Sequence, residues 1–130
     1  MSIFSVDFKV RDYECDLQGV VNNSVYQNYL EHTRHEYLLS RGLDFPTLTE
    51  QGIYLVVVRA ELDYRKALRP QDRFRVTLHP KLYGKLRVIF YQDIILDNSE
   101  LILQAQITAT AINPQGKPIA VPEIMQKLVE

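Results

Sequence analysis

Residues 22–42, NNSVYQNYLEHTRHEYLLSRG, decide the fold, because they carry the one long helical pattern of the chain. Apolar side chains recur there at helical spacing and predict a helix over about residues 24–41. Asn22 or Asn23 can cap its first turn, and Gly42 stands where helices commonly end. A helix of that length spans about 25 Å, enough to cross the face of a small sheet.

Strand patterns lie on both sides of this helix. Residues 3–12 alternate apolar and polar side chains, as a half-buried strand does. A short connection containing Pro46 follows the helix, and then come four long patterns rich in β-branched and aromatic residues, at 53–67, 73–82, 85–97 and 100–112. The order predicts an α+β domain in which one long helix is packed across a five-stranded, possibly six-stranded, antiparallel sheet.

The strand pattern at 100–112 has two different faces. One face is apolar with small members, and the other carries glutamine and threonine. The apolar face consists of Leu103, Ala105, Ile107, Ala109 and Ala111. Its alanines predict that the helix packs closely there. The polar face is expected either to meet solvent or to pair with another subunit.

Bulk composition narrows the class of protein. The 130 residues predict one domain, 1–130, and a hydrophobic share of 46% is ordinary for a globular chain. A formal net charge of −1 argues against nucleic acid as the main partner. The single cysteine, Cys15, excludes an internal disulfide and a cysteine-rich metal site. No apolar run resembles a signal peptide or a membrane span, so we expect a cytoplasmic protein without a membrane partner.

Two segments carry a family resemblance. Residues 10–34, VRDYECDLQGVVNNSVYQNYLEHTR, resemble the signature of hotdog-fold thioesterases, and most closely the 4-hydroxybenzoyl-CoA thioesterase branch. Residues 62–72, LDYRKALRPQD, resemble a second strand-and-turn element of that family. The resemblance covers nearly the whole chain and implies the hotdog fold. It also implies a hydrolase acting on acyl-CoA or acyl-ACP, with coenzyme A or phosphopantetheine present only as part of the substrate. Because the family's site lies between subunits, it implies a dimer or homotetramer.

Asp16 is the candidate catalytic carboxylate. Thioester hydrolysis needs an activated water or a nucleophile, and hydrogen-bond donors for the developing oxyanion. If the helix begins near Asn23, the backbone N–H of that residue has no helical acceptor and lies at the positive end of the helix dipole. A thioester carbonyl there meets this donor while Asp16 approaches its carbon or a neighbouring water. The resemblance implies the same arrangement, with Asp16 as general base or nucleophile. The alternative is a loop aspartate that binds nearby amides.

Other residues near Asp16 are candidates for smaller roles. Tyr13 is expected either to donate a hydrogen bond to substrate or Asp16, or to be a rim tyrosine. Gly19 allows a tight turn and close backbone approach, so Gly19, Val20 and Tyr26 are predicted to contact substrate. Asparagine at position 23 replaces the histidine of the bacterial acyl-CoA branch, so Asp16 is expected to work without a side-chain partner from that loop.

The helix supplies a second candidate carboxylate. Some hotdog thioesterases use one on the helix, where this chain has Glu31. The alternative for Glu31 is an ion pair with Arg34, three residues further along the helix. His32, His35 and His79 do not form a metal-ligand spacing, so no metal is expected.

Outside the loop, charge and hydrophobicity indicate further candidate substrate-binding residues. Residues 59–87 hold nine of the fifteen basic residues and three of the sixteen acids. This excess, with Arg59 and Lys85 as main candidates, is expected either to bind CoA phosphates or the acidic acyl carrier protein, or to be a solvated surface. Lys85 matches a CoA-phosphate contact of the family. Candidates for the acyl pocket, or for the core, are Tyr26, Tyr29, Leu30, Val56 and Val58. A module that binds or transfers acyl thioesters without efficient hydrolysis is the second functional hypothesis.

Overall fold

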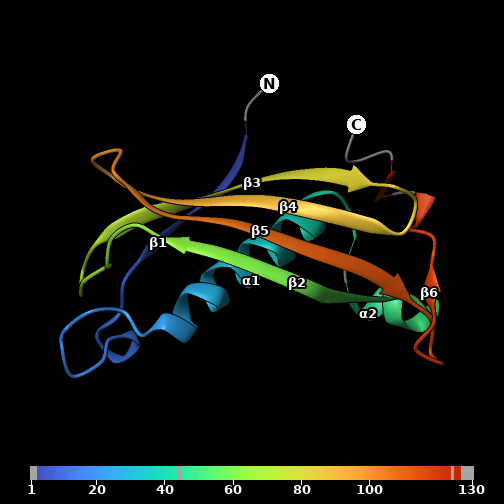
Figure 1. The fold of residues 1–130 in the computed structure, drawn as a ribbon, viewed down its shortest axis with the longest axis horizontal. Coiled ribbons are helices and arrows are strands. Elements are labelled where there is room, and N and C mark those ends of the chain that lie inside the picture. Colours follow the sequence, from blue (N-terminus) through green and yellow to red (C-terminus); the bar gives the residue numbers. More distant parts are fainter. Residues whose placement is uncertain (1–2, 44, 124, 127–130) are drawn as a thin grey trace.

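A computed structural model describes residues 3–43, 45–123 and 125–126. Within these ranges the named elements form a single six-stranded sheet, the α-helices α1 and α2, and a 3-10 turn (Figure 1). In chain order the elements are β1 (Phe4–Lys9), a 3-10 turn (Asp12–Glu14), α1 (Asn23–Ser40), α2 (Phe45–Glu50), β2 (Tyr54–Tyr64), β3 (Arg73–Tyr83), β4 (Arg87–Leu96), β5 (Leu101–Ile112) and β6 (Pro118–Ile119). Within the described ranges, no helix is both long and apolar enough to cross a membrane.

The sheet is antiparallel and α1 covers one of its faces. The strand order is β1-β3-β4-β5-β2, with β6 paired to the end of β5. Figure 1 shows α1 running obliquely beneath the curved sheet, with α2 at the far end of the same side. The predicted α+β arrangement, one long helix across an antiparallel sheet, is therefore confirmed, and the sixth strand is β6.

The ends of α1 follow from local chemistry. Asn22 is the N-cap, and its side-chain oxygen accepts a hydrogen bond from the Ser24 amide at 3.3 Å. At the other end Gly42 has φ of +80°, a conformation that glycine adopts without steric cost. The amide of Leu43 donates back to the carbonyl of Leu38 at 2.9 Å. The predicted helix is confirmed at both ends, with Asn22 rather than Asn23 as the cap.

The core lies between α1 and the central strands. Buried residues of α1 face the sheet, and burial alternates along much of β3 and β4, as it does in strands with one face toward a core. In β5 the consecutive residues 107–111 are all buried. Gln92 of β4 is a fully buried polar side chain, and its Nε2 donates to the Leu30 carbonyl at 3.0 Å. Ala105 lies directly beside Gln92 in the sheet, so the alanine-bearing face of β5 faces the helix at this point, as predicted.

Residues 45–50 differ from the prediction. They form the helix α2 rather than an irregular connection, and Leu48 is buried. Pro46 is compatible with this helix because proline is tolerated in a first turn, where no intrahelical amide bond is lost. The consequence is a second helix beside the start of β2, where the sequence predicted only a short connection.

Candidate active site

The loop before α1 is a compact hairpin-like turn. An isolated bridge joins Cys15 to Val21, and the Asp16 amide donates to the Val20 carbonyl at 2.9 Å. The Gly19 amide donates back to the Asp16 carbonyl at 3.0 Å, and Gly19 has φ of +75°. The expected tight turn at Gly19 is therefore present. It keeps Asp16 and Val20 next to each other at the helix start.

Glu14 fastens this loop to the helix. Its Oε1 accepts hydrogen bonds from the Tyr29 hydroxyl and from the Arg11 amide, each at 2.8 Å. Its carbonyl accepts from the Asn22 amide at 3.0 Å. Burial and the neighbouring Glu14 carboxylate both raise the pKa of Tyr29, so its hydroxyl stays protonated and keeps donating. Glu14 thus connects the loop to α1 through both its side chain and its backbone carbonyl.

The Asp16 carboxylate is exposed and oriented by its own loop. Its Oδ1 accepts from the Gln18 amide at 2.9 Å and from the Val20 amide at 3.5 Å. The amide-binding role foreseen as the alternative for Asp16 is therefore present. These bonds occupy Oδ1 and fix the carboxylate plane. Among the described residues, no backbone donor is recorded for Oδ2.

Asn23 is the first residue of α1. The next two amides, of Ser24 and Val25, donate to the side chain and carbonyl of Asn22. Within the described part of the chain, the Asn23 amide has no recorded acceptor, as expected for the first helical residue. The helix dipole adds partial positive charge at the same place. A carboxylate and an unsatisfied amide therefore flank the helix start.

The aromatic residues near the loop take different positions. Tyr13 is 80% exposed at the rim of the loop. Tyr26 is buried, its hydroxyl accepts from the Leu68 amide at 3.0 Å, and burial raises its pKa. Tyr26 therefore lies in the core behind the loop, and its contact with substrate stays a prediction. Desolvation, together with nearby carboxylates such as Asp12, raises the pKa of the Cys15 thiol, which disfavours a nucleophilic thiolate.

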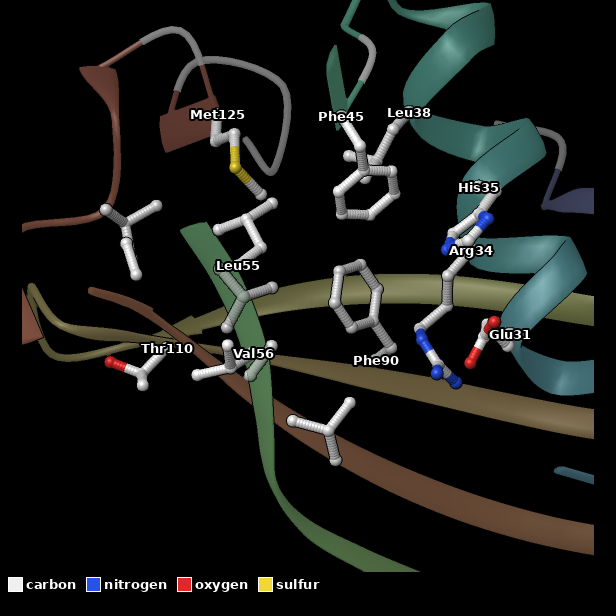
Figure 2. A pocket seen from close by; sticks show the side chains of 15 residues that line it. Glu31, Arg34, His35, Leu38, Phe45, Leu55, Val56, Phe90, Thr110 and Met125 are labelled. Carbon is white, nitrogen blue, oxygen red and sulfur yellow. The ribbon is translucent and has the colours of Figure 1, made fainter. Parts of the chain in front are cut away.

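A pocket of about 220 Å³ opens at the other end of α1 (Figure 2). Its walls come from the second half of α1, from α2, from the start of β2, from β4 and β5, and from the C-terminal segment. The lining residues include Leu38, Phe45, Leu55, Val56, Val57, Val88, Phe90, Ala109, Thr110, Ala111, Val121 and Met125. The side chains are mostly apolar, as in a site for an acyl group.

Sequence reasoning found little of this pocket. Of the five predicted acyl-pocket residues, Val56 lines it. Tyr26, Tyr29 and Leu30 are buried in the core, while Val58 is exposed at a bulge in β2. The sequence signal for this pocket was the pair of small residues Ala109 and Ala111, where close packing of the helix was expected. At this end of β5 the same small side chains instead line open space.

Three polar side chains of α1 lie along one wall of the pocket. Figure 2 shows the Arg34 side chain descending from the helix, with the Glu31 carboxylate beside its guanidinium. Arg34 Nη1 donates to Gln92 Oε1 at 3.1 Å. Burial lowers the pKa of Arg34, and the Glu31 carboxylate opposes that change. The predicted Glu31–Arg34 attraction is therefore present electrostatically, while the recorded hydrogen bond of the guanidinium goes to the sheet.

His35 is the third polar residue of that wall. Its ring lies 4.5 Å from that of Phe45, centroid to centroid. Burial lowers the pKa of His35, which favours the neutral imidazole. The part of the chain that the structure describes contains no group of three histidine, cysteine or acidic residues able to hold a metal.

The predicted cationic contacts are separated from Asp16. Lys85 is exposed in the β3–β4 turn, and its carbonyl accepts from the amide of the pocket residue Val121 at 2.8 Å. Arg59 lies on β2 and forms an ion pair with Glu61. The structure thus gathers Tyr13, Asp16, Gly19, Val20 and Asn23 at the start of α1. It places Lys85 and the pocket at the opposite end.

Comparison with known proteins fits this architecture. The model of the Thioesterase-like superfamily matches residues 10–129. The chain is 36% identical over 118 residues to the chloroplastic acyl-acyl carrier protein thioesterase ATL3 of Arabidopsis thaliana, covering 90% of this chain and 62% of that protein. It is 30% identical over 121 residues to a putative esterase of Aquifex aeolicus, covering 92% and 93%.

Solved structures show the same fold. A 1,4-dihydroxy-2-naphthoyl-CoA thioesterase from Synechocystis superposes with a TM-score of 0.92 at 21% identity, covering 98% of this chain and 96% of that one. The architecture is thus the hotdog fold expected from the two sequence segments. The chain spans about three-fifths of the length of the Arabidopsis relative. On the match over residues 10–129, the chain belongs to the Thioesterase-like superfamily.

Proposed function

We propose that this protein hydrolyses acyl thioesters to the free carboxylic acid, with Asp16 as general base or nucleophile and the Asn23 amide as oxyanion donor. The observation that carries the proposal is the helix start itself. There an exposed carboxylate, oriented by the Gln18 amide at 2.9 Å, accompanies a first-turn amide without a recorded acceptor. Membership of the Thioesterase-like superfamily supports this chemistry.

The roles follow from where charge develops. Attack on the thioester carbon turns the carbonyl oxygen into an oxyanion, which the Asn23 N–H and the helix dipole stabilise. Asp16 either takes a proton from the attacking water or attacks the carbon directly with Oδ2. In both routes the thiolate of coenzyme A or phosphopantetheine leaves. Direct attack first forms a mixed anhydride between Asp16 and the acyl group, which water then hydrolyses to the free acid and the Asp16 carboxylate. Tyr13, at the rim, is a further donor candidate.

The acyl pocket is proposed to come from a second copy of the chain. In one chain, about eleven residues of helix separate Asn23 from Arg34, or about 16 Å. The strand β2 is a long edge strand, and Val57 and Val58 on it are 49% and 47% exposed. Such edges are normally covered. Two copies related by a two-fold axis can pair β2 with β2 in antiparallel register, which gives a closed dimer.

That pairing completes the site. The start of β2 lines the pocket, and its last residue, Tyr64, packs on Tyr26 in the first turn of α1 with ring centroids 5.4 Å apart. Antiparallel pairing places the start of one β2 beside the end of the other. The Asp16 loop of each copy then lies beside the pocket of its partner. The substrate is thereby held between two subunits, and a tetramer would require a further contact.

Coenzyme A or acyl carrier protein is proposed to meet the β3–β4 turn. Three basic residues elsewhere in the 59–87 segment are engaged in ion pairs: Arg59 with Glu61, Arg65 with Asp63 and Lys66 with Glu100. Around the turn, Lys81, Lys85 and Arg87 are exposed at the pocket end of the sheet. Their charge suits phosphate or an acidic protein surface.

The decisive experiment is Asp16→Asn, assayed with a panel of acyl-CoA and acyl-ACP thioesters. The expected result is a rate at least about 100-fold lower, a barrier increase near 2.7 kcal/mol, with an unchanged unfolding midpoint. Asp12→Asn, in the same loop, is the matched control and should retain activity. Near-normal turnover by Asp16→Asn would transfer the role to Glu31. If the wild-type protein binds acyl-CoA but turns over no thioester, the second hypothesis, an acyl-binding or transacylating module, replaces hydrolysis.

A further inference from the structure

Arg34 is the charged residue whose placement the proposed reaction does not explain. Its guanidinium reaches the wall of a mostly apolar pocket, where burial disfavours its charge and lowers its pKa. Holding a cation there costs free energy unless hydrogen bonds compensate. Its one recorded hydrogen bond runs from Nη1 to Gln92 Oε1 at 3.1 Å.

The guanidinium is held in a fixed orientation. Gln92 is fully buried, and its Nε2 donates to the helix carbonyl of Leu30 at 3.0 Å. This bond fixes the amide, so that Oε1 is presented to Arg34. Arginine carries five N–H donors in a planar fork, and the bond to Gln92 uses one of them. The remaining donors have no recorded acceptor among the described residues, and no buried side-chain nitrogen or oxygen there lacks a partner. These donors are therefore accessible.

We infer that Arg34 determines acyl specificity by donating a hydrogen bond to a neutral oxygen, hydroxyl or carbonyl, on the acyl group. The inference rests on the proposed function and deepens it. Glu31, beside the guanidinium in Figure 2, balances its charge, so a second carboxylate from the substrate is disfavoured. The volume of about 220 Å³ equals the liquid volume of roughly seven water molecules at about 30 Å³ each, which suits a short acyl group. The predicted substrate is therefore a short acyl group that carries one oxygen beyond the thioester.

The experiment compares six-carbon substrates that differ only in that oxygen. The probes are hexanoyl-CoA, its 3-, 4-, 5- and 6-hydroxy derivatives, and adipoyl-CoA, whose second carboxylate tests the anionic alternative. For the wild-type protein we expect at least one hydroxy derivative to exceed hexanoyl-CoA about 10-fold or more in kcat/KM. A wild-type protein without such a preference, or one that prefers adipoyl-CoA, overturns the inference without any variant.

Arg34→Met then assigns the preference to the side chain. It keeps the length and removes the donors, so the hydroxy preference should fall to about 3-fold or less. Hydrolysis of hexanoyl-CoA should persist. Arg34→Lys retains one donor group and should keep part of the preference, and it also serves if the methionine variant fails to fold. Arg41→Met, at the C-cap of the same helix and outside the pocket lining, is the matched control. An equal loss on both substrates in Arg34→Met would show a structural role.

Binding measurements test the role of Arg34 even if the proposed hydrolytic function fails. If the wild-type protein hydrolyses none of these thioesters, dissociation constants for the same series, measured by calorimetry, replace kcat/KM. Tighter binding of a hydroxy derivative that is lost in Arg34→Met supports the role of Arg34 even though hydrolysis has failed. Equal affinities across the series refute the role of Arg34, whatever the outcome for hydrolysis.

Discussion

At the scale of single residues, Glu14 links the loop that carries Asp16 to the core side of α1. Tyr29→Phe removes the hydroxyl that donates to Glu14 at 2.8 Å and leaves a largely buried carboxylate short of a partner. We expect the free energy of unfolding to fall by about 1–3 kcal/mol, measured by urea denaturation. The hydrolytic rate should fall with it, because Asp16 loses its fixed position. Tyr83→Phe, on an exposed tyrosine, is the control and should change neither quantity.

His35 makes stability depend on pH. Burial lowers the pKa of His35 in the folded protein below the unfolded value near 6.5. Among its charged neighbours, Glu31 and Glu36 raise this pKa, whereas Arg34 and His32 lower it. As pH falls through 6.5 the unfolded chain takes up a proton first, so this contribution to stability is present above 6.5 and is lost on acidification.

The corresponding measurement compares thermal unfolding at pH 7.5 and pH 5. In His35→Asn the loss of stability on acidification should be smaller than in the wild-type protein. His79→Asn, which removes an exposed histidine, should reproduce the wild-type loss. Equal pH dependence in all three proteins would contradict the assignment.

At the scale of elements, the cap of α1 stabilises the helix whose first amide is the proposed oxyanion donor. Asn22→Ala removes the side-chain acceptor of the Ser24 amide and should cost about 1 kcal/mol of unfolding free energy in urea titrations. Asn28→Ala, exposed in the middle of the same helix, is the matched control. It should be neutral or slightly stabilising, because alanine has the higher helix propensity. Equal losses in both variants would mean that the cap contributes nothing.

The edge of β2 is the element on which the proposed dimer depends. Val58 lies at the bulge and is 47% exposed, so a lysine fits the monomer but interferes with pairing of two edges. Val58→Lys should sediment as a monomer at concentrations where the wild-type protein is a dimer or tetramer. Asn98→Lys, in the β4–β5 turn, adds the same charge elsewhere and should leave the mass unchanged. A Val58→Lys variant that remains an oligomer would place the interface on another surface.

Elements encoded by local signals were the predictable part of this fold. The cap at Asn22, the stop at Gly42 and the period-two strands all act within a few residues, and each was confirmed. The helix α2 was not predicted, because its six residues are too few to show a helical period. The pocket was missed because Arg34, Phe45 and Ala109 meet only through the tertiary fold.

At the scale of the whole molecule, the prediction concerns which chain supplies which half of the site. Ala109→Phe fills the pocket, and Asp16→Asn removes the carboxylate, so each variant alone should be inactive. In a dimer with shared sites, co-refolding the two variants regenerates one intact site in each mixed dimer. We expect about a quarter of wild-type activity at equal mixing, since half of the dimers are mixed and one of their two sites is intact. A mixture that stays inactive would mean that each site lies within one chain.

Asp16 is a candidate because of its sequence neighbourhood, and that neighbourhood is compact in the structure. The loop, the turn at Gly19 and the helix start lie within eight residues of each other. The relation of that loop to the pocket and to Lys85 was not readable from the chain, because one molecule places them at opposite ends of α1. A two-fold relation between copies leaves no local pattern in the sequence.

The strand order also determines how the chain can fold. Phe4 pairs with Leu78 and Tyr54 pairs with Ile112. Each edge strand therefore pairs only after a segment distant in sequence has been brought beside it. Closing loops of that length costs entropy before any contact compensates, which slows folding. Helix α1, whose contacts are local, can form early and present its apolar face before the sheet exists. Refolding should therefore show helical signal before tertiary signal, with the pairing of β2 and β5 completed late.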